Sequence, residues 1–244
     1  MSRTSGPAAA EAGRPTTEKV RGVFSRIARR YDMMNSVISM GLHHRWRRRT
    51  VAEAGLTPGC VVLDVAAGTG DLALEFARTG LPAKVVVTDF VSEMLDIARV
   101  KAEGFSGPTE LVFEIQDGQA LTLPDGSFDV VSVSFGVRNM PDRTAGFREA
   151  LRVLKPGGRY LILEFTAPSS WWFRPLFKLY TGAIVPLLGG LLAGDRASYQ
   201  YLNDSIMQFP PAGLLAAELR KAGFAQARWI PMLFGAVNLH VATK

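Results

Sequence analysis

Cysteine and histidine are scarce in this chain of 244 residues, which contains one cysteine and three histidines. A single cysteine excludes an internal disulfide, and the position of Cys60 at the start of an apolar strand predicts a buried structural thiol instead of a nucleophile. The few Cys and His residues form no cluster with the spacing of a metal site. The sequence therefore predicts neither a disulfide-bonded scaffold nor a metal centre.

Long uninterrupted apolar segments are lacking as well. The apolar run at residues 183–193 contains Pro186, Gly189 and Gly190, and it is shorter than the roughly 20 residues that a helix needs to cross a bilayer. We therefore predict that it does not span a membrane. The N-terminal stretch lacks the apolar core of a signal peptide, so residues 1–16 are predicted to be a disordered leader and the chain to be cytoplasmic.

Acidic residues are scarce in the first 50 positions, which hold 11 of the 28 lysines and arginines but only 3 of the 22 aspartates and glutamates. The net charge of +6 therefore originates at the N-terminus. Such a cluster can contact RNA phosphates or anionic lipid headgroups, and it can equally be a solvated helix face. The chain has no known RNA module, and we expect no nucleic-acid partner.

Residues 61–71, with the sequence VVLDVAAGTGD, combine a β-branched apolar run with a glycine-containing turn. This pattern predicts a buried parallel strand that leads through a ligand-binding turn into a helix. The turn fits two cofactors. The run GTGDLA satisfies the dinucleotide pattern GxGxxG/A, whereas the acidic signature of class I S-adenosylmethionine methyltransferases is matched by Asp64, Ala66, Gly68 and Gly70. This segment alone leaves both cofactors open.

Strands and helices alternate after this turn, which predicts one α/β domain with a largely parallel sheet. We expect further strands at 84–89, 111–115, 128–134 and 159–165, with a tight turn at 155–158. Helices are expected at 17–30, 72–78, 92–101, 143–154 and 212–222, and a second N-terminal helix should end near Gly55. The last two strands, 228–233 and 236–243, are predicted to form an antiparallel hairpin. This ending favours a methyltransferase sheet over a dinucleotide-dependent dehydrogenase. An RNA methyltransferase that binds phosphates through the basic N-terminus is a competing interpretation.

Polar residues follow the expected strands at their carboxyl ends, where open α/β sheets bind ligands. Asp89, 19 residues beyond the glycine turn, can accept both hydroxyls of a ribose, and Asp117 can receive an adenine amino group. Ser134, Arg138 and Asn139 follow the next strand. These side chains predict one ligand cleft along a single edge of the sheet.

Two segments lie outside the alternation of strands and helices. Residues 17–55 are predicted to form amphipathic helices that cover the cleft, and residues 56–244 to form the catalytic domain. Within that domain, the apolar insertion 167–210 contains Trp171, Trp172 and several phenylalanines beside lysine and arginine. Such a composition suits a lid that contacts a membrane surface and admits a lipid chain, and a packed insertion helix is equally compatible.

Four longer blocks carry a family resemblance. The first has the pattern YDxMNxxISxxxHxxW from Tyr31 to Trp46, and the second reads RVLKPGGxxLxLEF over 152–165, with Thr166 where serine is usual. The blocks SFGVRN at 134–139 and YxYLxxSIxxFP at 199–210 match as well. Together they resemble the ubiquinone and menaquinone biosynthesis C-methyltransferases over nearly the whole chain after the leader.

This resemblance implies a class I S-adenosylmethionine-dependent methyltransferase with a Rossmann-like seven-stranded sheet. It implies S-adenosylmethionine as cofactor and reduced demethylmenaquinone as acceptor, in the last step of menaquinone biosynthesis, with a benzoquinol of ubiquinone biosynthesis as the alternative. A lipid quinol substrate implies transient contact with the inner face of the cell membrane, and a homodimer is compatible with the family.

The resemblance and the glycine turn together give two sets of candidate site residues. The expected cofactor-binding residues are Asp64, Ala66, Gly68, Thr69, Gly70, Asp89, Asp117, Gly118 and Ser134. The expected substrate pocket contains Tyr31, Asn35, His43 and Tyr201. Ala66 stands where many methyltransferases have glycine, which should cost little if the position needs only a small side chain.

Methyl transfer to a ring carbon requires electron density from a phenolic oxygen that has lost or shared its proton. We expect Arg138 to polarise this oxygen or to organise a water that takes the proton, Asn139 to orient the ring, and Asp117 to assist. Arg138 stays protonated and is not itself the base. In a purely structural alternative, Arg138 pairs with Asp142. His240, on the last strand, is expected to be a buried core histidine.

Overall fold

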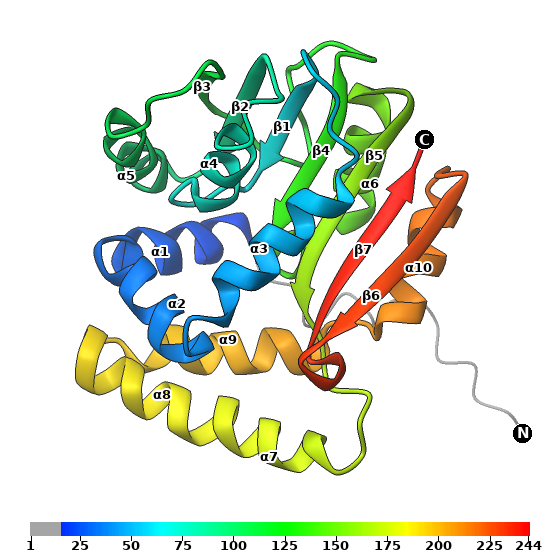
Figure 1. The fold of residues 1–244 in the computed structure, drawn as a ribbon. Helices are drawn as coiled ribbons and strands as arrows, with labels where there is room; N and C mark the ends of the chain where they lie inside the picture. The colour runs from blue at the N-terminus through cyan, green and yellow to red at the C-terminus, as the bar shows by residue number, and fades with distance from the viewer. Residues whose placement is uncertain (1–15) are drawn as a thin grey trace, which may run out of the picture.

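Seven strands form one sheet in this computed structural model, which describes residues 16–244 except for the side chain of Arg29. The predicted leader lies outside the described residues, apart from Thr16. The strand order is β3-β2-β1-β4-β5-β7-β6, and β7 runs antiparallel to both of its neighbours (Figure 1). The strands are β1 Val61–Val65, β2 Lys84–Asp89, β3 Glu110–Ile115, β4 Phe128–Ser134, β5 Leu154–Phe165, β6 Gln226–Met232 and β7 Val237–Thr243. The predicted α/β fold and terminal hairpin are confirmed.

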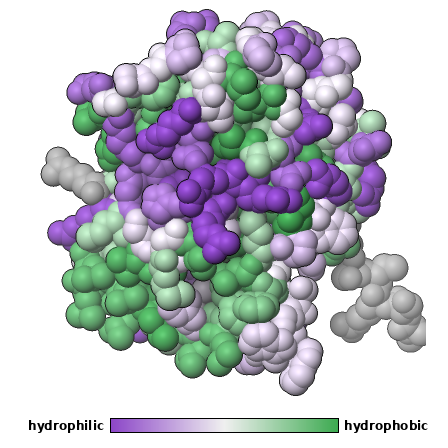
Figure 2. Space-filling model, in the orientation of Figure 1, coloured by the Kyte–Doolittle hydropathy of each residue, from purple (hydrophilic) through white to green (hydrophobic). Residues whose placement is uncertain are grey.

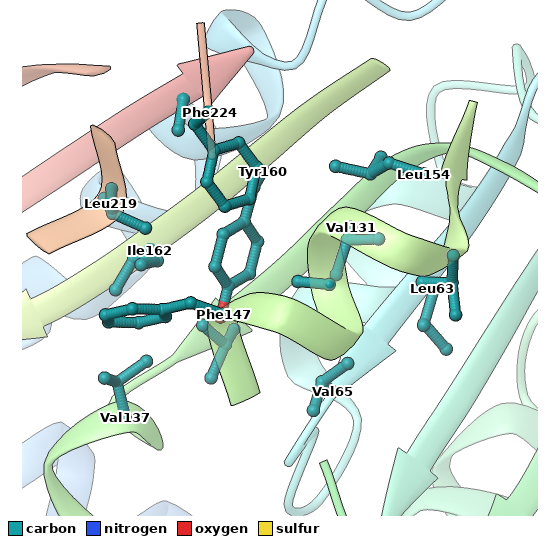
Figure 3. Packing of buried hydrophobic residues seen from close by; sticks show 14 of the residues in the cluster. Leu63, Val65, Val131, Val137, Phe147, Leu154, Tyr160, Ile162, Leu219 and Phe224 are labelled. Atoms are coloured by element: carbon teal, nitrogen blue, oxygen red, sulfur yellow. The ribbon is translucent and has the colours of Figure 1, made fainter. Parts of the chain in front are cut away.

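Helices cover both faces of the sheet, which is why its central strands are largely apolar. One face packs against α6 (Arg143–Val153) and α10 (Ala212–Lys221), and the other against α3 (Leu42–Glu53), α4 (Asp71–Ala77) and α5 (Ser92–Glu103). Figure 3 shows the first of these interfaces, where Tyr160 of β5 lies near Phe147 and Phe224, with ring centroids 6.3 and 5.6 Å away. The buried core thus fixes the parallel strands and aligns their carboxyl ends. His240 and Cys60 are buried as predicted.

Strand β5 begins at Leu154, so the predicted tight turn before it was wrong. Leu154 pairs with Phe128, and the register then shifts before Val130 pairs with Arg159. Gly157 has a φ of +76°, a left-handed conformation that glycine adopts without steric cost. Gly157 and Gly158 therefore form an irregularity within strand β5, and they do not separate a helix from a new strand.

The N-terminal helices α1 (Thr17–Ile27) and α2 (Tyr31–Ser39) lie beside the carboxyl ends of the parallel strands, next to α9 (Arg196–Gln208) (Figure 1). Hydrogen bonds to Asp32 connect α2 to the domain. Asp32 accepts one at 2.8 Å from Nζ of Lys101 on α5 and one at 2.6 Å from Oγ1 of Thr69 in the glycine turn. These contacts hold the predicted helical cover over the edge of the sheet where ligands bind.

The apolar insertion contains a helix that is longer than the sequence suggested. Residues Phe173–Ala193 form 21 continuous helical residues, in which π-helical turns follow α7 (Phe173–Leu179) and α8 (Val185–Leu188). A π-turn accommodates the missing N–H of Pro186, so the proline does not end the helix. A Cβ on Gly189 would lie 2.1 Å from Tyr199, so that glycine permits close packing of this helix on α9. Pro186 and Gly189, which were expected to interrupt this segment, are therefore accommodated within one continuous helix.

The length argument against a membrane span was therefore wrong. Among residues 16–244, the helix Phe173–Ala193 is the one with the length and apolar content of a span. Its buried residues Phe177, Thr181 and Val185 tie it to the domain. Its other face carries exposed apolar residues, and Figure 2 shows hydrophobic surface over the region where Figure 1 places α7 and α8. That this helix lies on the domain without crossing a bilayer stays a prediction.

Candidate active site

A cleft of about 680 Å³, counted to its open mouth, lies at the carboxyl ends of β1 to β4. Each of these strands contributes a residue that immediately follows or ends it, as parallel topology requires. The predicted cofactor residues on its wall are Ala66, Gly68, Asp89, Asp117, Gly118 and Ser134. The structure therefore brings six of the sequence-predicted residues, which are far apart in the chain, to one ligand-sized space.

Asp89 is held rigidly at the end of β2. Its Oδ2 accepts a hydrogen bond from the backbone N–H of Gly68 at 2.8 Å, and its Oδ1 accepts one from Val91 at 2.9 Å. Burial raises the pKa of this carboxyl to about 6, against the pull of those N–H donors. Each carboxylate oxygen keeps a second lone pair, so Asp89 can still accept hydrogen bonds from the hydroxyls of a ribose.

Two non-glycine residues on the wall of the cleft adopt left-handed backbone conformations, Ala66 after β1 at φ +50° and Phe135 after β4 at φ +57°. Such a conformation costs roughly 1–2 kcal/mol for a residue with a Cβ. The expectation that position 66 needs only a small side chain was therefore incomplete, because its backbone also favours glycine. Both strained residues line the cleft, where irregular backbone aims polar groups at a ligand.

Asp117 and Gly118 form the wall of the cleft beyond β3. Oδ1 of Asp117 accepts hydrogen bonds from the backbone and side-chain nitrogens of Gln119, at 2.9 and 3.1 Å. A Cβ on Gly118 would lie 2.6 Å from Cγ1 of Val65, so the backbone here passes too close to β1 for any side chain. The glycine keeps the chain against the sheet and leaves room for a ligand on its other side.

The charge of the cleft distinguishes between the two cofactors that the glycine turn fits. Its described lining contains the carboxylates Asp89 and Asp117 and neither lysine nor arginine. A pyrophosphate would meet two acidic side chains without a compensating cation, whereas a sulfonium and an amino group carry positive charge. The residues present therefore fit S-adenosylmethionine and disfavour a dinucleotide.

Three predicted cofactor residues build the turn and do not line the cleft. Asp64 is buried beneath it and accepts a hydrogen bond from Oγ of Ser132 at 2.6 Å, and burial raises its pKa to about 7. Thr69 donates its hydroxyl to Asp32. At Gly70, φ is +76° and a Cβ would lie 3.0 Å from that of Ala98. In this structure these residues shape and anchor the glycine turn.

A second cavity of about 740 Å³ lies beside the cleft and shares Phe24, Tyr31 and Phe135 with it as common wall. The four predicted substrate-pocket residues line this cavity: Tyr31, Asn35, His43 and Tyr201. Its remaining wall is largely aromatic and aliphatic. An apolar space with a few polar groups, next to a cofactor cleft, suits an uncharged ring substrate.

Arg138 lines the second cavity, and the carboxylate with which it forms an ion pair, Glu164, is fully buried. Its Nη1 lies 2.7 Å from Oε1 of Glu164, and the same nitrogen donates to the carbonyl of Phe135 at 2.5 Å. The expected alternative partner, Asp142, instead caps α6 by accepting hydrogen bonds from the backbone nitrogens of Thr144 and Ala145. Nε of Arg138 is buried without a hydrogen-bond partner among the described residues. The guanidinium therefore has donor capacity that the protein does not use.

The other two predicted catalytic residues take different positions. Asn139 lines the cofactor cleft, and its Oδ1 accepts a hydrogen bond at 3.1 Å from the hydroxyl of Tyr201, which lines the second cavity. This bond crosses the wall between the two spaces. Asp117 lines only the cofactor cleft, so the structure does not bring it to Arg138.

Sequence reasoning missed the partners that hold these residues. Glu164 lies one residue before the end of β5, and the rule about strand ends that found Asp89 would also have found it. The ion pairs of Asp71 with Lys101 and with Arg47, at 3.2 Å for Arg47, join three different helices. No sequence spacing signals them, because only the packed fold brings those helices together.

The sheet order and the acidic, cation-free cleft define the class of protein: this is an S-adenosylmethionine-dependent methyltransferase. A solved S-adenosylmethionine-dependent methyltransferase from Aquifex aeolicus has the same fold, with a TM-score of 0.58 and 18% identity over 81% of this chain and 88% of that one. The chain belongs to the ubiE/COQ5 methyltransferase family, whose profile matches residues 14–244.

Two relatives resemble the chain over almost their whole lengths. The ubiquinone/menaquinone biosynthesis C-methyltransferase UbiE of Teredinibacter turnerae is 41% identical over 93% of this chain and 92% of its own. The demethylmenaquinone methyltransferase of Deinococcus radiodurans is 42% identical over 93% of both chains.

Proposed function

We propose that this enzyme methylates a ring carbon of reduced demethylmenaquinone, giving menaquinol. The observation that carries the proposal is the enclosed Arg138–Glu164 pair on the wall of an apolar cavity that adjoins the cofactor cleft. A fixed cation in such surroundings stabilises a phenolate far better than an exposed one, because little water screens the charge. The family and the two relatives support a quinol as the acceptor.

The chain's own residues position the ring and manage its charge. When bound, S-adenosylmethionine supplies an electrophilic methyl group. Arg138 holds the phenolic oxygen next to the acceptor carbon in its electron-rich form after a water has taken its proton, and Asn139 sets the ring's angle through its bond to Tyr201. Once the methyl group is attached, the hydrogen on that carbon leaves as a proton to water and the ring becomes aromatic again. Reactive atoms held about 3–3.5 Å apart in an aligned geometry react much faster than free ones. Tyr31 and Phe135, shared by both spaces, would keep water away from that contact.

For the cofactor, we propose that Asp89 binds the ribose hydroxyls, Asp117 and Gly118 the adenine edge, and Ala66 and Gly68 the amino-acid part. Ser134 lies at the end of β4 on the same wall. Asp64, Thr69 and Gly70 contribute by holding the turn in place. The acidic lining supports this assignment because the cofactor carries positive charge at both its sulfonium and its amino group.

We further propose that the acceptor ring is a naphthoquinol and not a benzoquinol. It is supported by the relative named demethylmenaquinone methyltransferase, and the relatives named for both quinones keep the benzoquinol as the alternative. The test is incubation with methyl-labelled S-adenosylmethionine and matched reduced acceptors, demethylmenaquinol and the corresponding benzoquinol, with mass detection of products. We expect labelled menaquinol. Methylation of the benzoquinol alone would contradict the ring assignment, and no labelled quinol from either acceptor would contradict the function.

We also propose that the exposed apolar face of the helix Phe173–Ala193 meets the cytoplasmic surface of the cell membrane, where a lipid quinol resides. Trp171 is 86% exposed at one end of this face, and the further exposed apolar residues along it are Trp172, Leu176, Leu179, Ile184, Leu187, Leu191 and Leu192. Tryptophan and leucine on one helix face, next to cationic side chains, suit the bilayer interface. Buried residues of the same helix pack with Met34 and Tyr199 beside the second cavity.

A further inference from the structure

Ser39 and His43 form a hydrogen-bonded pair across the turn between α2 and α3. Oγ of Ser39 lies 2.6 Å from Nδ1 of His43 and also 2.6 Å from the backbone carbonyl oxygen of Asn35. His43 is only 4% exposed, and its ring forms part of the wall of the second cavity. The pair therefore sets the chemical character of one patch of the substrate pocket.

The number of protons in this pair determines which ring nitrogen of His43 carries hydrogen. A serine hydroxyl has one proton, and the Asn35 carbonyl can only accept, so Ser39 donates to that carbonyl. Ser39 must then accept at its other short contact, which requires a proton on Nδ1 of His43. In a neutral imidazole the second nitrogen, Nε2, is left with a free lone pair.

The surroundings keep this imidazole neutral. Burial, the neighbouring cation Arg47 and the ring of His44, the last two both on α3, together lower the pKa of His43 to about 4. Asp71 on α4 and Asp32 on α2 oppose the shift with smaller effects. At physiological pH the ring therefore carries one proton, and the contact with Ser39 places it on Nδ1.

Among residues 16–244, the hydrogen bond of the His43 ring is made through Nδ1, which leaves Nε2 available, and the ring lines the cavity. We propose that this nitrogen accepts a hydrogen bond from a ring hydroxyl of the substrate, and that Ser39 is the positioning residue that keeps Nε2 unprotonated. The inference rests on the proposed quinol substrate and adds a specificity to it. His43 then offers an acceptor to one oxygen of a reduced quinone, and Arg138 offers a cation to the other.

With this arrangement, His43 favours binding of the reduced quinone ring over the oxidised one. A reduced ring carries a hydroxyl that can donate to Nε2. An oxidised ring carries only carbonyl oxygens, which accept, so two acceptors would face each other and both would lose their hydrogen bonds to water. A site built to pair a hydroxyl rejects an analogue that lacks it. We expect the reduced ring to bind at least about 10-fold more tightly than the oxidised one.

The direct test is the tautomer of His43 in the wild-type protein, read from nitrogen-15 resonances of labelled histidine. The chain has three histidines, so His43→Gln and His44→Asn proteins assign the signals. We expect a proton on Nδ1 and none on Nε2, and a shift of the Nε2 resonance when a short-tailed reduced demethylmenaquinone is added without oxygen. A proton on Nε2, or an Nε2 resonance that ignores the bound quinol, would overturn the proposal.

Binding measurements on variants test this role of His43. The dissociation constants of the reduced and oxidised short-tailed ring are compared by titration. His43→Asn keeps a donor near Nδ1 but removes the Nε2 acceptor, so the preference for the reduced ring should disappear. Ser39→Ala frees the tautomer and should weaken the preference, and Ser39→Thr, which keeps the hydroxyl, should restore it. His44→Asn changes a neighbouring histidine that does not line the cavity, so it should leave the preference intact.

The outcomes separate this inference from the function it rests on. If the wild type methylates the quinol yet binds both oxidation states equally, or if His43→Asn keeps the full preference, the role of His43 fails alone. If no quinol is methylated but the tautomer and the preference are as expected, the proposed reaction fails and the binding site stands. Should His43→Asn not fold, the tautomer and the quinol-dependent shift in the wild type still decide.

Discussion

Arg138 places Nη1 2.7 Å from Oε1 of Glu164, and that carboxylate is wholly enclosed while the arginine lines the second cavity. Breaking such a pair by removing one partner costs about 3–5 kcal/mol, because the other charge stays buried and unpaired. We expect Glu164→Gln to lower the free energy of unfolding by about 3 kcal/mol, measured by denaturant titration. Glu218→Gln is the control, since it breaks the partly exposed pair with Arg143 and should cost less than about 1 kcal/mol. Equal losses in the two variants would contradict a buried pair.

Arg138→Ala should slow methyl transfer by about 100-fold or more while the affinity for S-adenosylmethionine changes less than about twofold, because the residue lines the substrate cavity and not the cofactor cleft. Single-turnover kinetics and calorimetry measure the two quantities. A double variant, Arg138→Met with Glu164→Gln, removes both buried charges and serves as the folding control. Unimpaired turnover at saturating quinol would remove Arg138 from the mechanism.

The pKa of Asp89, raised to about 6, predicts that folding stability and cofactor affinity change with pH in opposite directions. An aspartate in the unfolded chain has a pKa of about 4. Between this pH and pH 6, Asp89 is more protonated in the native protein than in the unfolded chain, so the stability that it contributes falls as pH rises. Cofactor binding uses the ionised carboxylate, so affinity for S-adenosylmethionine should rise through pH 6 and level off above pH 7. Calorimetry across this range measures it, and Asp89→Asn should abolish the step and weaken binding. A step that persists in Asp89→Asn would belong to another group.

Lys101→Met should accelerate release of the cofactor several-fold, because Lys101 joins Asp32 of the N-terminal cover to Asp71 of α4. Removing this cation leaves two carboxylates near each other without a shared partner. Stopped-flow dissociation of S-adenosylmethionine measures the rate. Arg99→Ala on the same helix breaks an exposed pair with Asp96 and is the matched control. Identical rates in both variants would show that the cover does not depend on Lys101.

Membrane contact should depend on the exposed face of the long apolar helix. Substitution of Trp171 and Leu187 by glutamine should reduce binding to anionic phospholipid vesicles about 10-fold, because each loses apolar area that would enter the interface. Vesicle sedimentation measures the bound fraction. Trp229→Gln, a tryptophan that is 44% exposed on β6, should leave binding unchanged. If all three substitutions act alike, or none does, vesicle binding does not use the helix.

Much of the fold and the cofactor cleft could be predicted from the sequence, because both follow local rules. Alternating apolar runs located the strands, and parallel strands must bring Asp89, Asp117 and Ser134 to one edge. Those rules use only short stretches of chain and the regularity of the sheet. They found the cleft without any knowledge of how the helices pack.

The rest could not be predicted because it depends on packing between distant segments. The contact of Lys101 with Asp32 joins α5 to α2, which are separated in the chain by α3, β1, α4 and β2, and no sequence spacing predicts it. The φ of +50° at Ala66 follows from how β1 leaves the sheet, which a residue's size alone does not reveal. Glycine and proline in the apolar insertion suggested interruption, but π-turns and the fit of Gly189 on Tyr199 kept that helix whole.

Tyr31, at the start of α2, belongs to the walls of both the cofactor cleft and the second cavity, and α2 is held by a few polar contacts. The helix that carries Tyr31 thus borders the binding spaces of both reactants. We expect turnover to be ordered, because a molecule bound in one space changes the wall of the other. Product-inhibition patterns would reveal the order, and a random order would contradict this expectation.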